Sequence, residues 1–295
     1  MTWVNFQTKT SELDRPVEAE IRNLWQEYLV DVLGIPPSTA QARIEAEVAG
    51  QLHVGLLDGL EAQGWTFRDA VVLDLGCGTG ALASALTARG ALVVGVEPSP
   101  AWAKMAHKRL QKKDPLRRGI VIADGARIPL ADNTVDYVMS LQVLEHVPMQ
   151  AAKQMIAEIA RVLRPGGRAY LAFENYWSFW EPHYQVRWLP LLPKPIGAFY
   201  LKLRGRNPQF LCEHIYYNSF LMLAKACFDA GLAKSHWKTL AYKLEQPELV
   251  MGPFQRQLAR SLRFLPPHVR STLVVMVTER YQLTQTTVRL ELSNG

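Results

Sequence analysis

The stretch that decides the fold is Ala70-Val71-Val72-Leu73-Asp74-Leu75-Gly76-Cys77-Gly78-Thr79-Gly80-Ala81. A short apolar, β-branched run that gives way to glycines and then to a helix-forming segment is typical of a buried parallel strand leading into a ligand-binding turn. The glycines allow a sharp backbone turn and let a ligand lie close to the main chain. We therefore expect a ligand at the end of this strand.

A second acidic residue supports a nucleoside as that ligand. Glu97 ends the next apolar run, 91–96, and stands 21 positions after Gly76. A carboxylate at this place can accept hydrogen bonds from both hydroxyls of a ribose. Because Asp74 is also the last polar group of the first strand, the pattern favours a nucleoside cofactor.

Four segments, in this order, resemble the class I S-adenosylmethionine-dependent methyltransferases of the small-molecule type. Residues 72–80 resemble the first motif of that family, and 94–99 resemble the second, in which the acid holds the ribose. Residues 123–130 are similar to the third, whose acid faces the adenine amino group, and 163–168 match the turn before the fifth strand. The resemblance is strong over 70–173 and loose elsewhere. It implies S-adenosylmethionine as the cofactor.

The resemblance also implies which residues bind the cofactor: Asp74, Gly76, Cys77, Gly78, Gly80, Glu97, Pro98, Asp124, Gly125, Ala126 and Gln142. A dinucleotide dehydrogenase is the main competitor for the glycine loop, since its fingerprint permits Ala81 at the third glycine position. Asp74 and Asp124 suit adenosine and a cationic methionine tail better than a pyrophosphate, and so favour the methyltransferase.

Composition limits the remaining classes. A chain of 295 residues with 48% hydrophobic content can bury one large core, or one core with an appendage. No segment approaches the ~20 apolar residues of a membrane helix, and the first residues do not have the pattern of a secretory signal. The three cysteines are widely spaced and suggest neither a disulfide framework nor a metal knuckle. We expect a cytoplasmic protein without a membrane span.

The net charge of +6 comes mostly from scattered residues. Basic runs occur at 104–118, 194–206 and 256–270. Such runs are usually solvated faces, so no nucleic-acid partner is expected, while peripheral contact with an anionic membrane stays open.

Strands and helices alternate through the core, which predicts an α/β fold. Strands are expected at 71–75, 92–96, 120–123, 135–140 and 168–173, and helices at 81–89, 100–112 and 149–163. The alternation indicates a parallel sheet covered on both faces, with ligands at the carboxyl ends of the strands. The resemblance makes this a Rossmann-like, seven-stranded, mostly parallel sheet.

Four parts are expected along the chain: an N-terminal helical extension (1–69), the cofactor-binding core (70–173), a cap insertion after the fifth strand (174–217) and the C-terminal part of the core (218–295). One helix is expected from Asp14 to about Val32. A second begins at Ser38 and has one apolar face, made of Ile44, Val48, Leu52 and Leu56, and a third runs from Asn218 to Ala230. In the resembling family such an N-terminal extension often closes over the cofactor, and simple packing on the sheet is the alternative.

The C-terminal part is expected to end the sheet. Residues 235–244 and 271–280 are predicted as an antiparallel pair of strands, with an amphipathic basic helix at 253–265 between them. The tail after Gln282 carries no pattern that we interpret.

The insertion at 174–217 is rich in aromatic residues and prolines and falls after the fifth strand. Long irregular insertions in compact domains are usually functional or mobile, and we interpret this one as a substrate cap. A hydrophobic lid without substrate contact is the alternative.

Methyl transfer to a hydroxyl requires positioning of the acceptor and removal of its proton. The candidate bases are His183 in the insertion and His146 after the fourth strand, and His214 is a third candidate. For each of them, a purely structural role is the alternative. His183 follows Pro182, which restricts the backbone just before the imidazole. Neutral imidazole can accept a proton near neutral pH.

Residues 141–147 are similar to a loop of quinone-precursor O-methyltransferases, which bind a divalent metal through a Glu-x-x-Glu-His pattern. Gln142 stands where the first glutamate would be, and an amide is a poorer ligand for a hard cation. No metal is therefore predicted.

The Pro-Pro-aromatic step of methyltransferases that act on base amino groups is missing from this segment. The sequence thus predicts a methyltransferase acting on a small molecule, most simply at a hydroxyl oxygen. The apolar cap suits an acceptor with an aromatic or lipid-linked portion. A methyltransferase acting on RNA or protein, and a cofactor-binding module without turnover, are the alternatives.

Overall fold

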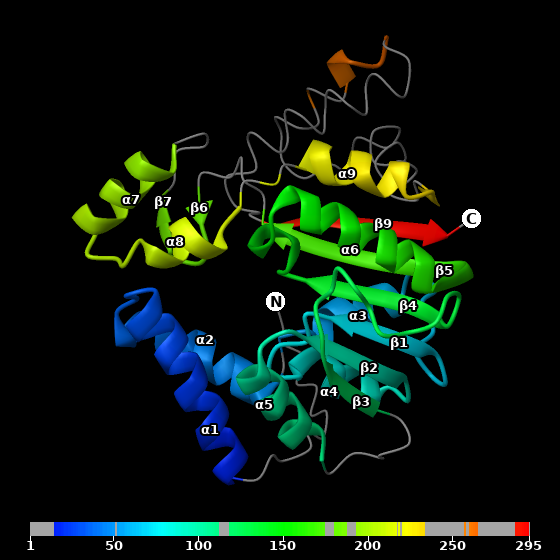
Figure 1. Cartoon of the computed structure of the whole chain (residues 1–295), viewed down its shortest axis with the longest axis horizontal. Coiled ribbons are helices and arrows are strands. Elements are labelled where there is room, and N and C mark those ends of the chain that lie inside the picture. The colour runs from blue at the N-terminus through cyan, green and yellow to red at the C-terminus, as the bar shows by residue number, and fades with distance from the viewer. Residues whose placement is uncertain are drawn as a thin grey trace.

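The protein is built around one sheet of seven strands, in the order β3-β2-β1-β4-β5-β9-β8 (Figure 1). The computed structural model describes residues 15–50, 52–111, 118–174, 180–187, 193–216, 218, 220–233, 257, 260–264 and 287–294. The strands are β1 (Val71–Leu75), β2 (Leu92–Glu97), β3 (Arg118–Ile122), β4 (Val135–Leu141), β5 (Leu163–Glu174), β8 (Leu232–Ala233) and β9 (Thr287–Asn294). The first five pair in parallel, which confirms the predicted α/β fold with a mostly parallel sheet.

Alternate residues of β1, β4 and β5 enter two separate apolar cores, one on each face of the sheet. Leu73 and Leu75 of β1 belong to the first core, and Val72 between them belongs to the second. The first core is completed by α6 (Met149–Val162) and α9 (Phe220–Asp229), the second by α3 (Val54–Glu61) and α4 (Ala81–Ala88). Figure 1 shows the two helical layers on opposite sides of the sheet. Burial on both faces explains why β1 is a nearly continuous apolar run.

The N-terminal helices differ from the expectation at one point. The helix α1 (Arg15–Gln26) continues as a π-helical turn, η1 (Glu27–Val32), as the spacing predicted. The predicted helix from Ser38 through Leu56 is instead two helices, because α2 (Pro37–Ala49) ends at Gly50, whose φ of +64° is left-handed. Leu52, which was expected on the apolar face, is 49% exposed.

The antiparallel strand beside β5 is a second correction. β9 pairs with β5 from Arg168↔Ser293 to Glu174↔Thr287, so the tail in which we saw no pattern supplies an inner strand of the sheet. Thr287-Val288-Arg289-Leu290-Glu291-Leu292 alternates polar and apolar residues, which is a strand signal. The strands predicted at 235–244 and 271–280, and most of the helix at 253–265, lie outside the described residues.

The insertion after β5 is more regular than expected. Its described residues form a short hairpin of β6 (Trp180–Glu181) and β7 (Val186–Arg187), followed by α7 (Lys194–Leu203) and α8 (Gln209–His214). These elements share a third apolar core with the N-terminal helices and with Met105 of α5 (Pro100–Leu110). The core joins Ile21, Leu29, Leu33, Ile35, Ala40, Ile44 and Val48 to Tyr184, Val186, Leu201, Phe210, Leu211 and Ile215. Two segments far apart in the sequence therefore pack as one unit beside the sheet.

Candidate functional site

The glycine loop after β1 has the backbone that its sequence predicts. Gly76, Gly78 and Gly80 all have positive φ, at +77°, +54° and +78°. A Cβ atom on Gly76 would overlap the side chain of Val143 from the loop after β4. Glycine is required at this position for two reasons, the left-handed conformation and the close approach of a neighbouring loop.

Glu97, at the end of β2, faces the glycine loop. Its Oε2 accepts a hydrogen bond from the backbone N–H of Gly78 at 3.0 Å, and its Oε1 accepts one from the N–H of Ser99 at 3.0 Å. Each carboxylate oxygen has a further lone pair for a ligand hydroxyl. The carboxylate is therefore fixed in place next to the loop, as a ribose-binding group needs to be.

Asp74 is buried beneath the loop, with a side chain that is not fully satisfied. It is only 2% exposed, and its Oδ2 has no hydrogen-bond partner among the described residues. Burial, and then the proximity of Glu97 and Glu47, raise the pKa of Asp74 to about 7, while a bond from the backbone of Ala83 opposes this shift. A buried acceptor without a partner fits a ligand that brings a donor or a positive charge, as the methionine part of the predicted cofactor does.

The other predicted cofactor residues lie at the same ends of the strands. Asp124 is exposed after β3, where its Oδ1 accepts the backbone N–H of Ala126 at 2.9 Å, and Gly125 between them is buried against Met155 and Leu75. Pro98 is exposed after Glu97, and Cys77 is buried within the glycine loop. Gln142, with φ of +59°, begins the turn after β4, where its backbone N–H donates to Ala172 at 2.7 Å. Their roles in binding stay predictions.

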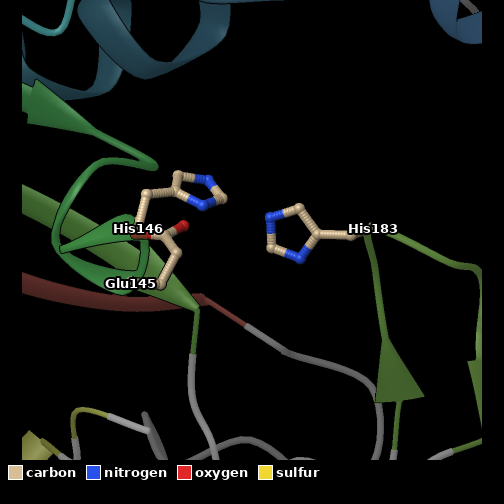
Figure 2. A group of neighbouring side chains, drawn as sticks. All are labelled: Glu145, His146 and His183. Carbon is tan, nitrogen blue, oxygen red and sulfur yellow. The ribbon is translucent and has the colours of Figure 1, made fainter. Parts of the chain in front are cut away.

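The structure brings the two predicted catalytic histidines together. His146 lies in a short 3₁₀ turn, η3 (Leu144–His146), after β4, and His183 lies in the turn between β6 and β7. Their ring centroids are 5.0 Å apart, with the planes at 77°. Figure 2 shows Glu145 and His146 coming from one segment and His183 approaching them from the opposite side.

Hydrogen bonds define the tautomer of each imidazole. Nδ1 of His146 lies 3.0 Å from the carbonyl oxygen of His214, and Nδ1 of His183 lies 2.7 Å from Oε1 of Glu181. Both partners are acceptors, so each Nδ1 carries the hydrogen, and Nε2 holds the lone pair in the neutral ring. Oε2 of Glu181 also accepts the N–H of Tyr184 at 2.6 Å, which holds the carboxylate in the turn.

The two rings differ in their affinity for protons. Burial and the neighbouring His183 hold the pKa of His146 well below its usual range. Burial alone would lower the pKa of His183, but the carboxylate of Glu181, with Glu145 and Glu174, raises it above the ordinary value. His183 is therefore the more basic of the two imidazoles.

Glu145 is an unexpected third member of this group. It is 3% exposed, and within the described part of the chain neither carboxylate oxygen has a hydrogen-bond partner of good geometry. Burial raises the pKa of Glu145 to about 8, although the nearby His183 lowers it. The carboxyl group of Glu145 therefore has a pKa near neutral pH, and it lies beside a basic imidazole.

This group adjoins the glycine loop and the insertion. Val143, three residues before His146, packs over Gly76, because β1 and β4 are neighbours in the sheet. The end of the insertion is bonded to the same turn: the N–H of Tyr216 donates to the carbonyl of Glu145 at 2.8 Å, and Nδ2 of Asn218 donates to the carbonyls of Leu144 and Val147, both at 2.8 Å. The turn of His146 therefore lies between the cofactor loop and the insertion, which carries His183.

Sequence reasoning did not find four residues of this region. Glu145 matches the second glutamate of the Glu-x-x-Glu-His pattern, but that pattern does not show its approach to His183. Glu181 holds Nδ1 of His183, and no local pattern shows this contact. Glu47 of α2 accepts a hydrogen bond from the hydroxyl of Thr79 at 2.7 Å, so the N-terminal helices reach the glycine loop. Trp102 of α5 lies next to Gly78, 3.7 Å from the place of a Cβ.

Glu145, His146 and His183 also have the chemistry of a metal site. Each offers one ligand atom, and these atoms lie within 4.8 Å of one another. Two imidazoles and a carboxylate suit a divalent transition metal. The sequence led us to expect no metal, and this expectation stays a prediction.

Part of the core is similar to a known protein family. Residues 73–171 match the family described as a methyltransferase domain. This segment of the chain is therefore similar to a methyltransferase domain. The bounds of the match enclose the glycine loop, Glu97, Asp124 and the turn that carries His146, and they end before the insertion.

Curated relatives are similar to part of the chain. An uncharacterized methyltransferase of Mycobacteroides abscessus is 42% identical over 116 residues, which are 38% of this chain and 43% of the relative. One from Mycolicibacterium vanbaalenii is 38% identical over 154 residues, 50% of this chain and 56% of the relative. The chain thus spans about half the length of the curated relatives that it matches.

The overall fold has a counterpart among solved structures. A candidate sarcosine dimethylglycine methyltransferase from Galdieria sulphuraria superposes with a TM-score of 0.55 at 16% identity, covering 95% of this chain and 98% of that one. This likeness shows the fold, and it includes the regions outside the core. In the described part of the chain, no helix is long and apolar enough to cross a membrane.

Proposed function

We propose that this protein transfers the methyl group of S-adenosylmethionine to a hydroxyl oxygen of a small-molecule acceptor, with His183 as the base or positioning group. The observation that carries the proposal is the pairing of Glu181 with His183, beside His146 and next to the cofactor loop. A buried imidazole whose Nδ1 is held by a carboxylate presents Nε2 as a proton acceptor.

The roles of the residues follow from their contacts. Bound S-adenosylmethionine supplies an activated methyl group on a sulfonium sulfur. Glu97 and the glycine loop hold the nucleoside part of the cofactor. Asp74, near the end of β1, faces its positively charged methionine part. Nε2 of His183 takes the proton of the acceptor hydroxyl, and Glu181 stabilises the imidazolium that forms. Glu145 lies close to both imidazole rings and is a second group that can share the proton taken from the acceptor.

We further propose that residues 174–217 form a substrate cap. The N-terminal helices and the insertion share one apolar core, and the end of the insertion is hydrogen-bonded to the turn of His146. An acceptor held between this cap and the sheet would be shielded from water. The aromatic residues of the cap favour an acceptor with a ring or a lipid-linked portion.

Cofactor binding is tested first, by calorimetry with S-adenosylhomocysteine. Glu97→Ala should weaken binding by ~10-fold or more, since hydrogen bonds to charged groups contribute about 1.5–3 kcal/mol each. Glu61→Ala, which removes an exposed carboxylate of α3, should leave the affinity unchanged. Undetectable binding by the intact protein would end the proposal.

The base is tested by turnover, with release of S-adenosylhomocysteine measured against a panel of phenols, catechols and polyprenol-linked sugars. His183→Ala should lower turnover by ~10²-fold or more, while the affinity for S-adenosylhomocysteine stays close to that of the parent. Loss of turnover only in His146→Ala would move the assignment to His146. Full activity in both variants would mean that positioning alone suffices.

Two further measurements separate the alternatives. Turnover on bulk RNA or protein, and not on the panel, would show a macromolecular acceptor, and cofactor binding without any turnover would show a binding module. Metal analysis of the purified protein, and activity after chelation, would separate a base at His183 from a metal held by Glu145, His146 and His183.

A further inference from the structure

The helix α7 of the insertion is anchored by one face and exposes an apolar stripe on the other. Gly197 and Leu201 are buried, and Leu201 belongs to the core shared with the N-terminal helices. Ile196, Phe199 and Leu203 are 52%, 63% and 70% exposed. Three large apolar side chains that are more than half exposed on a ten-residue helix form a contiguous feature of the surface, which single exposed residues do not.

The geometry of an α-helix aligns these three side chains. At 3.6 residues per turn, Ile196, Phe199 and Leu203 fall within an arc of ~60°. By the same rule Lys202 lies on one side of the stripe and Arg204 on the other, and both are exposed. The surface of α7 is therefore an apolar stripe between two cations.

The stretch around α7, between Glu181 and Glu213, has charges of one sign. Residues 182–212 contain five basic residues, Arg187, Lys194, Lys202, Arg204 and Arg206, and no aspartate or glutamate. Lys194 donates to the carbonyl of Cys212, and Arg206 donates to the carbonyls of Tyr184 and Gly34, so these two are used within the fold. The other three, Arg187, Lys202 and Arg204, are exposed. Arg204 also donates from Nε to the hydroxyl of Tyr200 at 3.3 Å and lies over that ring.

Among the described elements, α7 lies at the edge of the molecule. In Figure 1 α7 is the outermost helix of its side of the molecule, beyond β6, β7 and α8 and away from the sheet. The exposed fractions of Ile196, Phe199 and Leu203 place the stripe on the solvent side of this helix.

We propose that α7 docks on the surface of an anionic lipid bilayer. An apolar stripe enters the boundary between headgroups and acyl chains, and the flanking cations meet the acidic headgroups. Lys202 and Arg204 are long enough to extend from the buried stripe to the headgroup level. A nucleic acid would account for the cations but not for the stripe. This proposal goes beyond the proposed methyl transfer and does not depend on it.

The test is co-sedimentation of the full chain with vesicles of phosphatidylcholine, or of phosphatidylcholine and phosphatidylglycerol in equal parts. The parent protein should bind the mixed vesicles, bind the neutral ones weakly, and dissociate as salt is added. The triple variant Ile196→Ser, Phe199→Ser, Leu203→Ser should lose ~10-fold or more of the partition into mixed vesicles. The double variant Lys202→Glu, Arg204→Glu should lose the preference for mixed over neutral vesicles.

Matched controls keep this test decisive. Phe228→Ser removes an aromatic side chain of α9 that is 57% exposed, and should leave vesicle binding unchanged. Unchanged binding of S-adenosylhomocysteine by each variant reports that the core is folded, and the single variant Phe199→Ser replaces the triple one if the latter does not fold. Absence of binding to mixed vesicles, binding that the α7 variants do not reduce, or binding of bulk RNA in place of vesicles would overturn the proposal.

Discussion

At the scale of single residues, the contact between Glu181 and His183 makes a prediction about pH. If His183 accepts the proton, turnover rises as pH rises through the pKa of His183, because only the neutral ring is a base. Burial lowers this pKa and the carboxylate of Glu181 raises it, to a net value above the ordinary one. Glu181→Gln should therefore move the rising limb of the profile to lower pH, by ~1 unit.

This shift is measured from the pH dependence of kcat/KM, which reports groups of the free enzyme. Glu213→Gln is the matched control, since Glu213 is exposed beside the exposed His214. A merely structural role of Glu181 would lower turnover equally at every pH. An unmoved limb would mean that His183 does not titrate in the reaction.

Glu145 makes a prediction about stability. Its pKa is about 8 in the folded protein and 4.5 ordinarily, so folding takes up a proton between these values. The resulting stabilisation is complete below pH 4.5 and is lost as pH rises through about 8. Glu145→Gln, which keeps the shape without the charge, should gain stability relative to the parent as pH rises from about 5 to about 9.

Thermal unfolding of the two proteins across this range measures the effect, as the difference in Tm at each pH. Glu61→Gln, on the exposed surface of α3, should show no such trend. A difference in Tm that stays constant with pH would contradict the raised pKa.

At the scale of elements, the loop between β1 and α4 depends on its closest neighbour. Gly76→Ala places a methyl group in contact with Val143 and forces a left-handed conformation on a side chain, at φ of +77°. We expect a loss of about 2 kcal/mol or more of stability. Gly119→Ala in β3 is the control, because no atom lies within 4 Å of its Cβ position.

Urea unfolding gives the free energy of both variants. Val143→Ala should rescue part of the loss in Gly76→Ala, because it removes the methyl groups that the new side chain meets. Equal stability of Gly76→Ala and the parent would show that the two loops are not tightly packed.

Elements also show how far the sequence predicts the structure. The five parallel strands and the glycine loop are predicted from the sequence, because local patterns of two to ten residues encode them, whereas β9 is missed although its residues alternate. The end of α2 at Gly50 is not predicted, but the sequence contains a signal for it, since a glycine after a helical run often ends the helix. The contact of His183 with Glu145 and His146 could not be predicted, because the sequence does not tell how the insertion folds back over the turn after β4. The same holds for Glu47 and Thr79, which meet through the packing of α2.

At the scale of the whole molecule, the N-terminal helices and the insertion should unfold as one unit. Tyr28 of η1 and Phe210 of α8 are in edge-to-face contact, with ring centroids 5.4 Å apart at 72°. A double-mutant cycle with Tyr28→Leu and Phe210→Leu should give a coupling of about 0.5–1.5 kcal/mol.

Tyr28→Leu combined with Phe67→Leu is the reference cycle, because Phe67 belongs to the core beneath the sheet. Those two changes should add within about 0.3–0.5 kcal/mol. Additive behaviour of Tyr28 and Phe210 would mean that the extension and the insertion are independently stable.

The place of β9 in the sheet has a consequence for the order of folding. β5 spans 163–174, and the strand that pairs with it spans 287–294, so more than a hundred residues are synthesised between the two. During this interval β5 is an open edge with unpaired backbone groups, which can pair with another chain. Pairings of such long sequence separation also form slowly. A nascent chain that has already formed the cofactor loop still needs β9 to cover the edge of β5. Until β9 has been synthesised, chaperones can bind the exposed edge.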